Sequence, residues 1–223
     1  MESQFKKFAA KLDRDVEDLG SGDDFAEAAG SLARDVNTLL ILAMAIGQSE
    51  EKGEINSAPA IVQACKDVLA ATDATGAAMA TKQLQAAIAA PASGGETKWE
   101  KAASLAPLMT KTLPSLTTEI KRLSRNQNTL TRGDNAAKVA GDAATLAVIA
   151  YGCRVNVSET NAPTEEKLWK EYCDRLCGAS LKLNDSVTSL REKKGSFEDF
   201  SAALQEVEAT CNTTCHEKFS ATK

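Results

Sequence analysis

The sequence is most informative through the residues it has little of. Histidine occurs once among 223 residues, and aromatic residues make up 4% of the chain. A single imidazole excludes most hydrolytic and zinc chemistries, which need several histidines. Because aromatic side chains are scarce, aliphatic residues and alanine must build the core. Five prolines and 13 glycines are too few for a disordered or fibrous chain.

Charge and hydropathy limit the partners and the compartment. A net charge of −5 argues against nucleic acid and anionic membranes as partners. The longest apolar run, residues 39–46, is far shorter than the roughly 20 residues of a membrane span, so no span is expected. The first twenty residues read as an amphipathic helix, whereas six cysteines are typical of an oxidising compartment. We therefore expect a periplasmic or secreted protein whose signal peptide has been trimmed.

Alanine is abundant, with 38 copies, and it is the best helix former. Apolar residues recur at three- and four-residue steps nearly throughout, which predicts an all-α fold. Within one long predicted helix, Pro107 and Pro114 are expected to cause kinks. The predicted helices cover residues 5–19, 23–48, 60–72, 75–90, 98–125, 133–156, 164–191 and 196–220.

An internal repeat suggests how these helices are organised. Residues 33–43 align with 140–150 at an offset of 107, and five of the eleven positions are identical. Residues 63–68 align with 171–176 at an offset of 108. We therefore predict two tandem antiparallel up-down four-helix bundles, joined near residues 91–97. The first, 1–92, would be a degenerate copy and the second 97–223; one long irregular helical domain is the alternative.

Cysteines are concentrated in the last two predicted helices. Cys173 and Cys177 lie on the seventh helix, and Cys211 and Cys215 lie on the eighth. Each pair is spaced i, i+4, so both thiols share one helix face. His216, the single histidine of the chain, directly follows the last cysteine. This quartet with its histidine is the most chemically dense part of the sequence.

The run Cys-x-x-x-Cys-His-Glu-Lys-Phe at residues 211–219 resembles the haem-attachment helix of the four-helix-bundle cytochromes c, the cytochrome c-prime type. The resemblance covers about residues 97–223 and most of it is helix pattern. Trp169 on the preceding helix fits it, and Met109 occupies the helix on which some members carry a distal methionine. The usual spacing in the family is Cys-x-x-Cys-His, so this chain has one additional intervening residue.

The resemblance implies a set of ligands and a function. Cys211 and Cys215 would form thioethers to haem c, His216 would be the axial iron ligand, and Met109 the distal ligand. The protein would be an exported c-type cytochrome-like protein that carries electrons or binds a small gas. Its partners would be a redox protein or that gas, and a homodimer is one option for its assembly.

The same cysteines support a second interpretation. Lys194 lies midway along the chain between Cys177 and Cys211, and it also lies midway between Cys173 and Cys215. In an antiparallel helical hairpin that turns at Lys194, residues equidistant from the turn face each other. Two disulfides, Cys173–Cys215 and Cys177–Cys211, would then staple a haem-less helical bundle that acts as a binding or structural module.

The two interpretations exclude each other, because a thiol in a thioether cannot form a disulfide. A four-cysteine metal site is a further option, although zinc sites more usually contain Cys-x-x-Cys. Cys65 and Cys153 are expected to be buried small apolar residues. No pair of base and nucleophile is evident, so we do not expect an enzyme.

Overall fold

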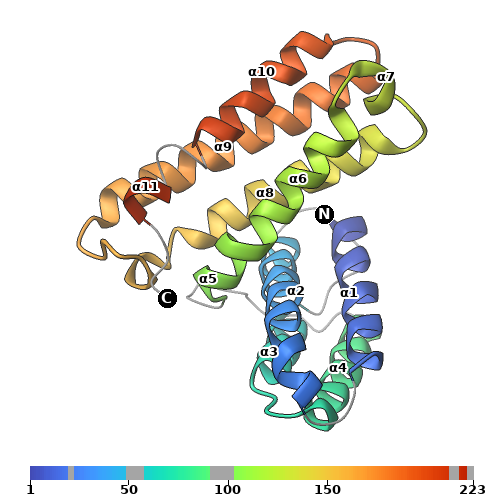
Figure 1. The fold of residues 1–223 in the computed structure, drawn as a ribbon, viewed down its shortest axis with the longest axis vertical. Helices are drawn as coiled ribbons and strands as arrows, with labels where there is room; N and C mark the ends of the chain where they lie inside the picture. The colour runs from blue at the N-terminus through green and yellow to red at the C-terminus, as the bar shows by residue number, and fades with distance from the viewer. Residues whose placement is uncertain (20–22, 49–57, 91–102, 211–215, 220–223) are drawn as a thin grey trace. The chain divides into compact units, whose positions relative to one another are not determined.

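The structure is a computed structural model that describes residues 1–19, 23–48, 58–90, 103–210 and 216–219. The all-α prediction is confirmed, because the regular secondary structure in these ranges is helical, without strands. The helices gather into two compact units, Met1–Thr112 and Leu113–Lys223 (Figure 1).

Unit 1 is built around one long, apolar helix. Its helices are α1 (Glu2–Glu17), α2 (Asp23–Gly47), α3 (Ala58–Leu69) and α4 (Ala74–Ala89). Consecutive helices pack against one another, and α4 also packs against α1. A short α5 (Leu105–Pro107) and a π-helical turn η1 (Leu108–Thr112) pack against α2. The bounds of α1 to α4 follow the predicted ranges closely, because the apolar periodicity that defines them is buried.

Unit 2 contains α6 (Leu113–Ser124), α7 (Gln127–Leu130), α8 (Asn135–Cys153) and a 3-10 turn η2 (Val157–Glu159). It continues with α9 (Glu166–Arg191), α10 (Phe197–Glu208) and α11 (His216–Phe219). Helix α8 packs against α6 and along α9, and α10 packs along α9. Like α2 in unit 1, α8 is buried along most of its length.

The division between the two compact units falls at the end of η1. The boundary lies between Thr112 and Leu113, whereas the predicted join near residues 91–97 lies outside the described residues. Residues 103–112 belong to unit 1 because they pack and bond to α2. The Ser104 amide donates to the Asn37 side chain at 2.7 Å, and the Thr112 and Thr38 hydroxyls are 3.1 Å apart.

A single helix was predicted over residues 98–125, and the described part of it is irregular. A π-helical turn separates α5 from α6, and it lies between Pro107 and Pro114. Neither proline has an N–H to donate to the carbonyl four residues earlier. Pro107 lies in the first turn of α5, where no such bond is made, whereas Pro114 removes the bond to the Thr110 carbonyl beside the wider turn.

The residues aligned by the repeat occupy matching environments. Asp35 of α2 and its counterpart Asp142 of α8 are both completely buried. Thr38 and Thr145 are also buried, and each hydroxyl donates to the carbonyl four residues earlier. The aligned positions therefore lie on the central helix of each unit, facing its interior.

Within the described ranges, two helical segments have the length and hydropathy of membrane spans. They are Ala28–Gly47, near the N-terminus, and Asn135–Cys153. In each, most of the apolar window is buried inside the structure, 67% and 61% respectively. Buried core helices and signal sequences have this same composition, so these segments are weak evidence for a membrane span.

Asp35 is held in unit 1 by two cations. Its carboxylate accepts hydrogen bonds from Lys11 at 2.6 Å and from Arg34 at 2.6 and 2.7 Å. Burial alone would raise the pKa of Asp35, but the bonds from Arg34 and Lys11 outweigh it and hold the pKa below its usual value. Lys11 also bonds to Asp15 at 2.5 Å, so α1 is tied to α2 through this cluster.

We predict that Asp35→Asn lowers the free energy of unfolding by about 2–3 kcal/mol, because it leaves Lys11 and Arg34 without their buried counter-charge. Asp15→Asn is the matched control, since Asp15 is partly exposed, and it should cost less than about 1 kcal/mol. Urea denaturation at pH 7 measures both. An equal loss in the two variants would contradict the role given to Asp35.

The stability of wild type and Asp35→Asn should also differ in its pH dependence. A carboxyl whose pKa is lower in the folded than in the unfolded state stabilises the fold above the unfolded pKa, about 4. That contribution is lost as the pH falls through the lower, folded pKa. The stability difference between the two proteins should therefore be constant above about pH 4 and shrink below it. A difference that grows on acidification would be inconsistent with a lowered pKa.

Candidate functional site

The structure describes the predicted site residues unequally. Cys211 and Cys215 lie outside the described residues, and His216 is described only as the first residue of α11. Met109 is buried in η1 and belongs to unit 1. Cys173 and Cys177 lie one turn apart on α9, the first buried and the second half-buried.

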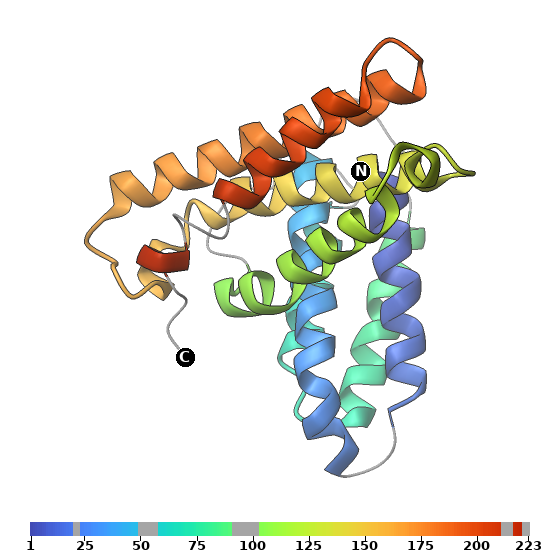
Figure 2. The same ribbon diagram turned by 45° about the horizontal axis from the view of Figure 1, so that its top comes forward.

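Helices α9 and α10 form the hairpin that was predicted to turn at Lys194 (Figure 2). The amides of Lys194 and Gly195 both donate to the Ser189 carbonyl, at 2.8 and 3.2 Å, and close the turn. A Cβ atom at Gly195 would lie 3.0 Å from the Ser189 Cβ atom, so this close approach favours glycine. Ser196 then begins α10 through a capping box with Asp199.

The register of this hairpin can be read from two contacts. Lys194 lies midway along the chain between Lys182 and Glu206, which form an ion pair at 2.7 Å. It lies midway between Trp169 and Phe219 as well, and these rings meet edge to face with centroids 5.3 Å apart. Residues equidistant from the turn therefore face each other both before and after the segment 211–215.

One further contact of α11 departs from this symmetry. Lys218 forms an ion pair at 2.7 Å with Glu165. Along the chain, Glu165 lies farther from Lys194 than Lys218 does, so this pair does not join equidistant residues. Both side chains are long and about 40% exposed, so they can reach along the helix. The Lys182 and Glu206 side chains are also long and are 66% and 49% exposed, so the buried rings of Trp169 and Phe219 define the register best of these three contacts.

An aromatic cluster anchors the end of the chain on α9. Trp169 and Phe219 are almost completely buried, and Tyr172 lies 5.8 Å from Phe219, centroid to centroid. The Trp169 indole N–H donates to the Cys153 carbonyl at 2.8 Å, so the ring also holds the end of α8. The Trp169 and Phe219 rings therefore pack directly between α9 and α11.

The described cysteines lie in different electrostatic environments. Burial raises the pKa of Cys65 to about 12, so its thiol is inert and the prediction of a buried apolar residue is confirmed for it. Burial, with the nearby charge of Asp174, raises the pKa of Cys177, while Arg154 opposes the shift. Cys153 is buried too, as predicted. No disulfide joins any two cysteines in the described ranges.

Metal ligands are not gathered in the part of the chain that the structure describes. There, no group of three or more His, Cys, Asp or Glu side chains is placed to hold a metal ion. The four-cysteine metal site and the haem site both include residues 211 and 215, which lie outside this part. Both therefore stay predictions.

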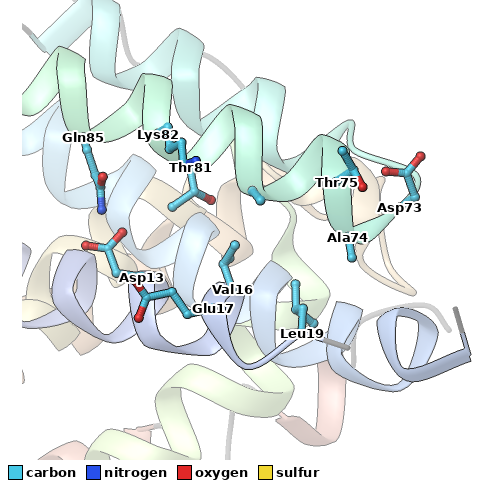
Figure 3. A pocket seen from close by; sticks show the side chains of 11 residues that line it. Asp13, Val16, Glu17, Leu19, Asp73, Ala74, Thr75, Thr81, Lys82 and Gln85 are labelled. Atoms are coloured by element: carbon cyan, nitrogen blue, oxygen red, sulfur yellow. The ribbon is translucent and has the colours of Figure 1, made fainter. Parts of the chain in front are cut away.

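Sequence reasoning missed a groove in unit 1, between α1 and α4 (Figure 3). Its acidic residues Asp13 and Glu17 are spaced i, i+4, a signal that the sequence does contain. That spacing is also common on exposed helix faces, so it does not indicate a site until the position of α4 is known.

Comparison of the chain with protein-family models, with curated proteins and with solved structures finds no match. The resemblance to cytochromes c therefore rests on the motif at residues 211–219 and the helix pattern around it. Function has to be argued from the chemistry and geometry of the chain itself.

We predict that Phe219→Ala lowers the free energy of unfolding by about 3 kcal/mol, because a buried ring packed on Trp169 is lost. In a Trp99→Phe background, which leaves Trp169 as the one tryptophan, the emission should shift to longer wavelength as water reaches the indole. Lys182→Ala, in an exposed pair of the same hairpin, is the control and should cost less than about 1 kcal/mol. Wild-type stability and emission in Phe219→Ala would show that α11 does not anchor on α9.

Proposed function

We propose that unit 2 is an antiparallel up-down four-helix bundle whose last hairpin is stapled by two disulfides, Cys173–Cys215 and Cys177–Cys211. In this proposal the protein is a non-catalytic binding or structural module of an oxidising compartment, periplasmic or secreted. Such compartments are where disulfides form and persist.

The observation that carries the proposal is the register of α9 against α10 and α11. The contacts Lys182–Glu206 and Trp169–Phe219 both join residues equidistant from Lys194. Along the chain, these two contacts bracket the four cysteines. When the same rule is extended to the positions between them, it pairs Cys173 with Cys215 and Cys177 with Cys211.

Packing of the two helices supports bridges rather than an intervening cofactor. The Trp169 and Phe219 rings pack directly on each other, less than one turn beyond His216 in the chain. Disulfides need Cα atoms within about 7 Å, closer than the roughly 8–10 Å between ordinary helix axes. Gly178, beside Cys177, has no side chain of its own and open space where a Cβ atom would lie, which permits such an approach.

Two disulfides would raise the free energy of unfolding of this hairpin. Among the described residues of α11, Phe219 packs on Trp169 and Tyr172 of α9, and Lys218 forms an exposed ion pair with Glu165 at the N-cap of that helix. Each disulfide would add roughly 2–4 kcal/mol by restricting the unfolded chain. The bridges would therefore reinforce the attachment of the short helix α11 to α9.

The up-down arrangement and the duplication belong to the same proposal. Asp35 and Asp142 occupy matching buried positions on α2 and α8. Cys65 and Cys173, which the repeat also aligns, are both buried, on α3 and α9. Unit 1 would then be a copy that never carried, or has lost, the cysteine pairs.

A c-type cytochrome is the second candidate, because the one histidine of the chain directly follows Cys215. Under this alternative, Cys211 and Cys215 would hold haem c and His216 would bind its iron, for electron transfer or binding of a small gas. The aromatic packing beside the motif fits this candidate less well than the staple. Met109, in unit 1, is not used in either argument.

The test is to express the full chain in an oxidising compartment that contains haem-attachment machinery. Two disulfides predict a mass about four protons below that of the reduced chain and no Soret band. Trypsin without reductant should leave the peptides containing Cys173, Cys177 and the Cys211–Cys215 run linked to one another. A Soret band that survives denaturation would instead establish the cytochrome.

Paired cysteine variants test the register itself. The matched double variant Cys173→Ser/Cys215→Ser keeps an equidistant pair and should retain one bridge. The mismatched double variant Cys173→Ser/Cys211→Ser leaves two cysteines about 6 Å apart along the helix axis and should form none. Equal bridging in both variants would contradict the proposed pairing.

A further inference from the structure

The groove between α1 and α4 is a second candidate site, in unit 1. Its volume is about 660 Å³, enough for a small organic molecule. Residues of the C-terminal half of α1 form one wall, and residues from the N-terminus to the middle of α4 form the other (Figure 3). Neither wall contributes to the hairpin of unit 2, so the groove is independent of the proposed staple.

The groove is acidic. Asp13 and Glu17 lie side by side on α1 and face α4, and Asp73 lies at the start of α4 (Figure 3). Lys82 adds one positive charge to the lining, against these three carboxylates. Within the described part of the chain, neither Asp13 nor Glu17 has an ion-pair partner. The lining therefore favours a cationic ligand.

Thr81 provides an observation independent of the charges. It is 3% exposed, it lines the groove, and its hydroxyl has no hydrogen-bond partner among the described residues. Other helical threonines of this chain donate to the carbonyl four residues earlier, as Thr38, Thr145 and Thr210 do. A buried hydroxyl without a partner costs stability, which a ligand's donor would relieve.

The arrangement of polar and apolar residues limits the shape of the ligand. Thr81 and Asp73 are just over two turns apart on α4, about 12 Å along the helix. Between them the lining is mostly apolar, with Ala74 and Ala78 of α4 and Val16 of α1, and Thr75 adds a hydroxyl. Two acidic ends separated by a mostly apolar stretch that contains one hydroxyl match a linear aliphatic chain with a charged group at each end and a polar group between them.

An anion fits this groove poorly. The N-terminus of α4 would attract one, but the Asp73 carboxylate already accepts from the Gly76 amide at 2.7 Å and occupies that position. Asp73 keeps further lone pairs for a cation. Both ends of the groove, at Asp73 and at Asp13 and Glu17, therefore favour a positively charged group of the ligand.

We propose that this groove binds a linear aliphatic polyamine. One terminal ammonium lies between the Asp13 and Glu17 carboxylates and donates to the Thr81 hydroxyl. The methylene chain covers Val16 and Ala78, and the other end of the molecule reaches Asp73. Charge-assisted hydrogen bonds provide the specificity, and burial of the methylene groups adds affinity.

Calorimetric titration of the full chain with spermidine tests the proposal. Wild type should bind one spermidine per chain. Asp13→Asn/Glu17→Gln should weaken binding by about tenfold or more, the loss expected when charge-assisted hydrogen bonds are removed. Absence of binding to wild type would overturn the proposal.

A control separates the groove from general attraction of a polycation to an acidic protein. Asp67→Asn, on α3, removes one charge from the same unit outside the groove and should bind spermidine like wild type. The single variant Asp13→Asn, with the same charge change, should lose several-fold in affinity. Equal affinities of Asp13→Asn and Asp67→Asn would overturn the proposal.

Thr81→Val tests the hydroxyl with little change in shape. Without ligand its melting temperature should equal or exceed that of wild type, because a buried hydroxyl without a partner is removed. Its affinity for spermidine should fall several-fold. Unchanged affinity would overturn the placement of the terminal ammonium at Thr81.

Discussion

Burial of one apolar helix at the centre of each unit is the constraint on which the rest of the structure depends. In α2, six consecutive side chains, residues 39–44, are at most 2% exposed, so this helix must be covered on all sides. With aromatics scarce, aliphatic side chains and alanine provide that cover. Helices α1, α3 and η1 pack around α2, and α6 and α9 pack around α8.

When a helix is buried on all sides, its polar side chains need hydrogen-bond or ion-pair partners inside the protein. In unit 1, Asp35 has such partners. Asp35 of α2 is neutralised by Arg34, its neighbour, and by Lys11, which reaches it from α1. The bond from Lys11 therefore sets the position of α1 along α2. Asp13 and Glu17 lie about 160° and 120° round α1 from Lys11, because successive residues of an α-helix are about 100° apart. The same contact therefore turns these two carboxylates toward α4 and the groove.

The sequence by itself determined the all-α class, the bounds of most helices within a few residues and the turn at Lys194. These follow from periodicity and from Gly195 and the capping pair Ser196 and Asp199, which act over short distances. It also indicated the equivalence of α2 and α8, since the aligned residues Asp35 and Asp142 are both buried.

The tertiary structure decided what depends on distant contacts. It assigned residues 103–112 to unit 1, because Ser104 and Thr112 form hydrogen bonds with α2. Such bonds cannot be inferred from the amino-acid composition by which the linker was predicted. It brought Asp13 of α1 and Thr81 of α4 to one groove, although they are far apart in the chain. Local pattern fixes which residues are helical, whereas the packing of α1 against α4 fixes which helix faces meet.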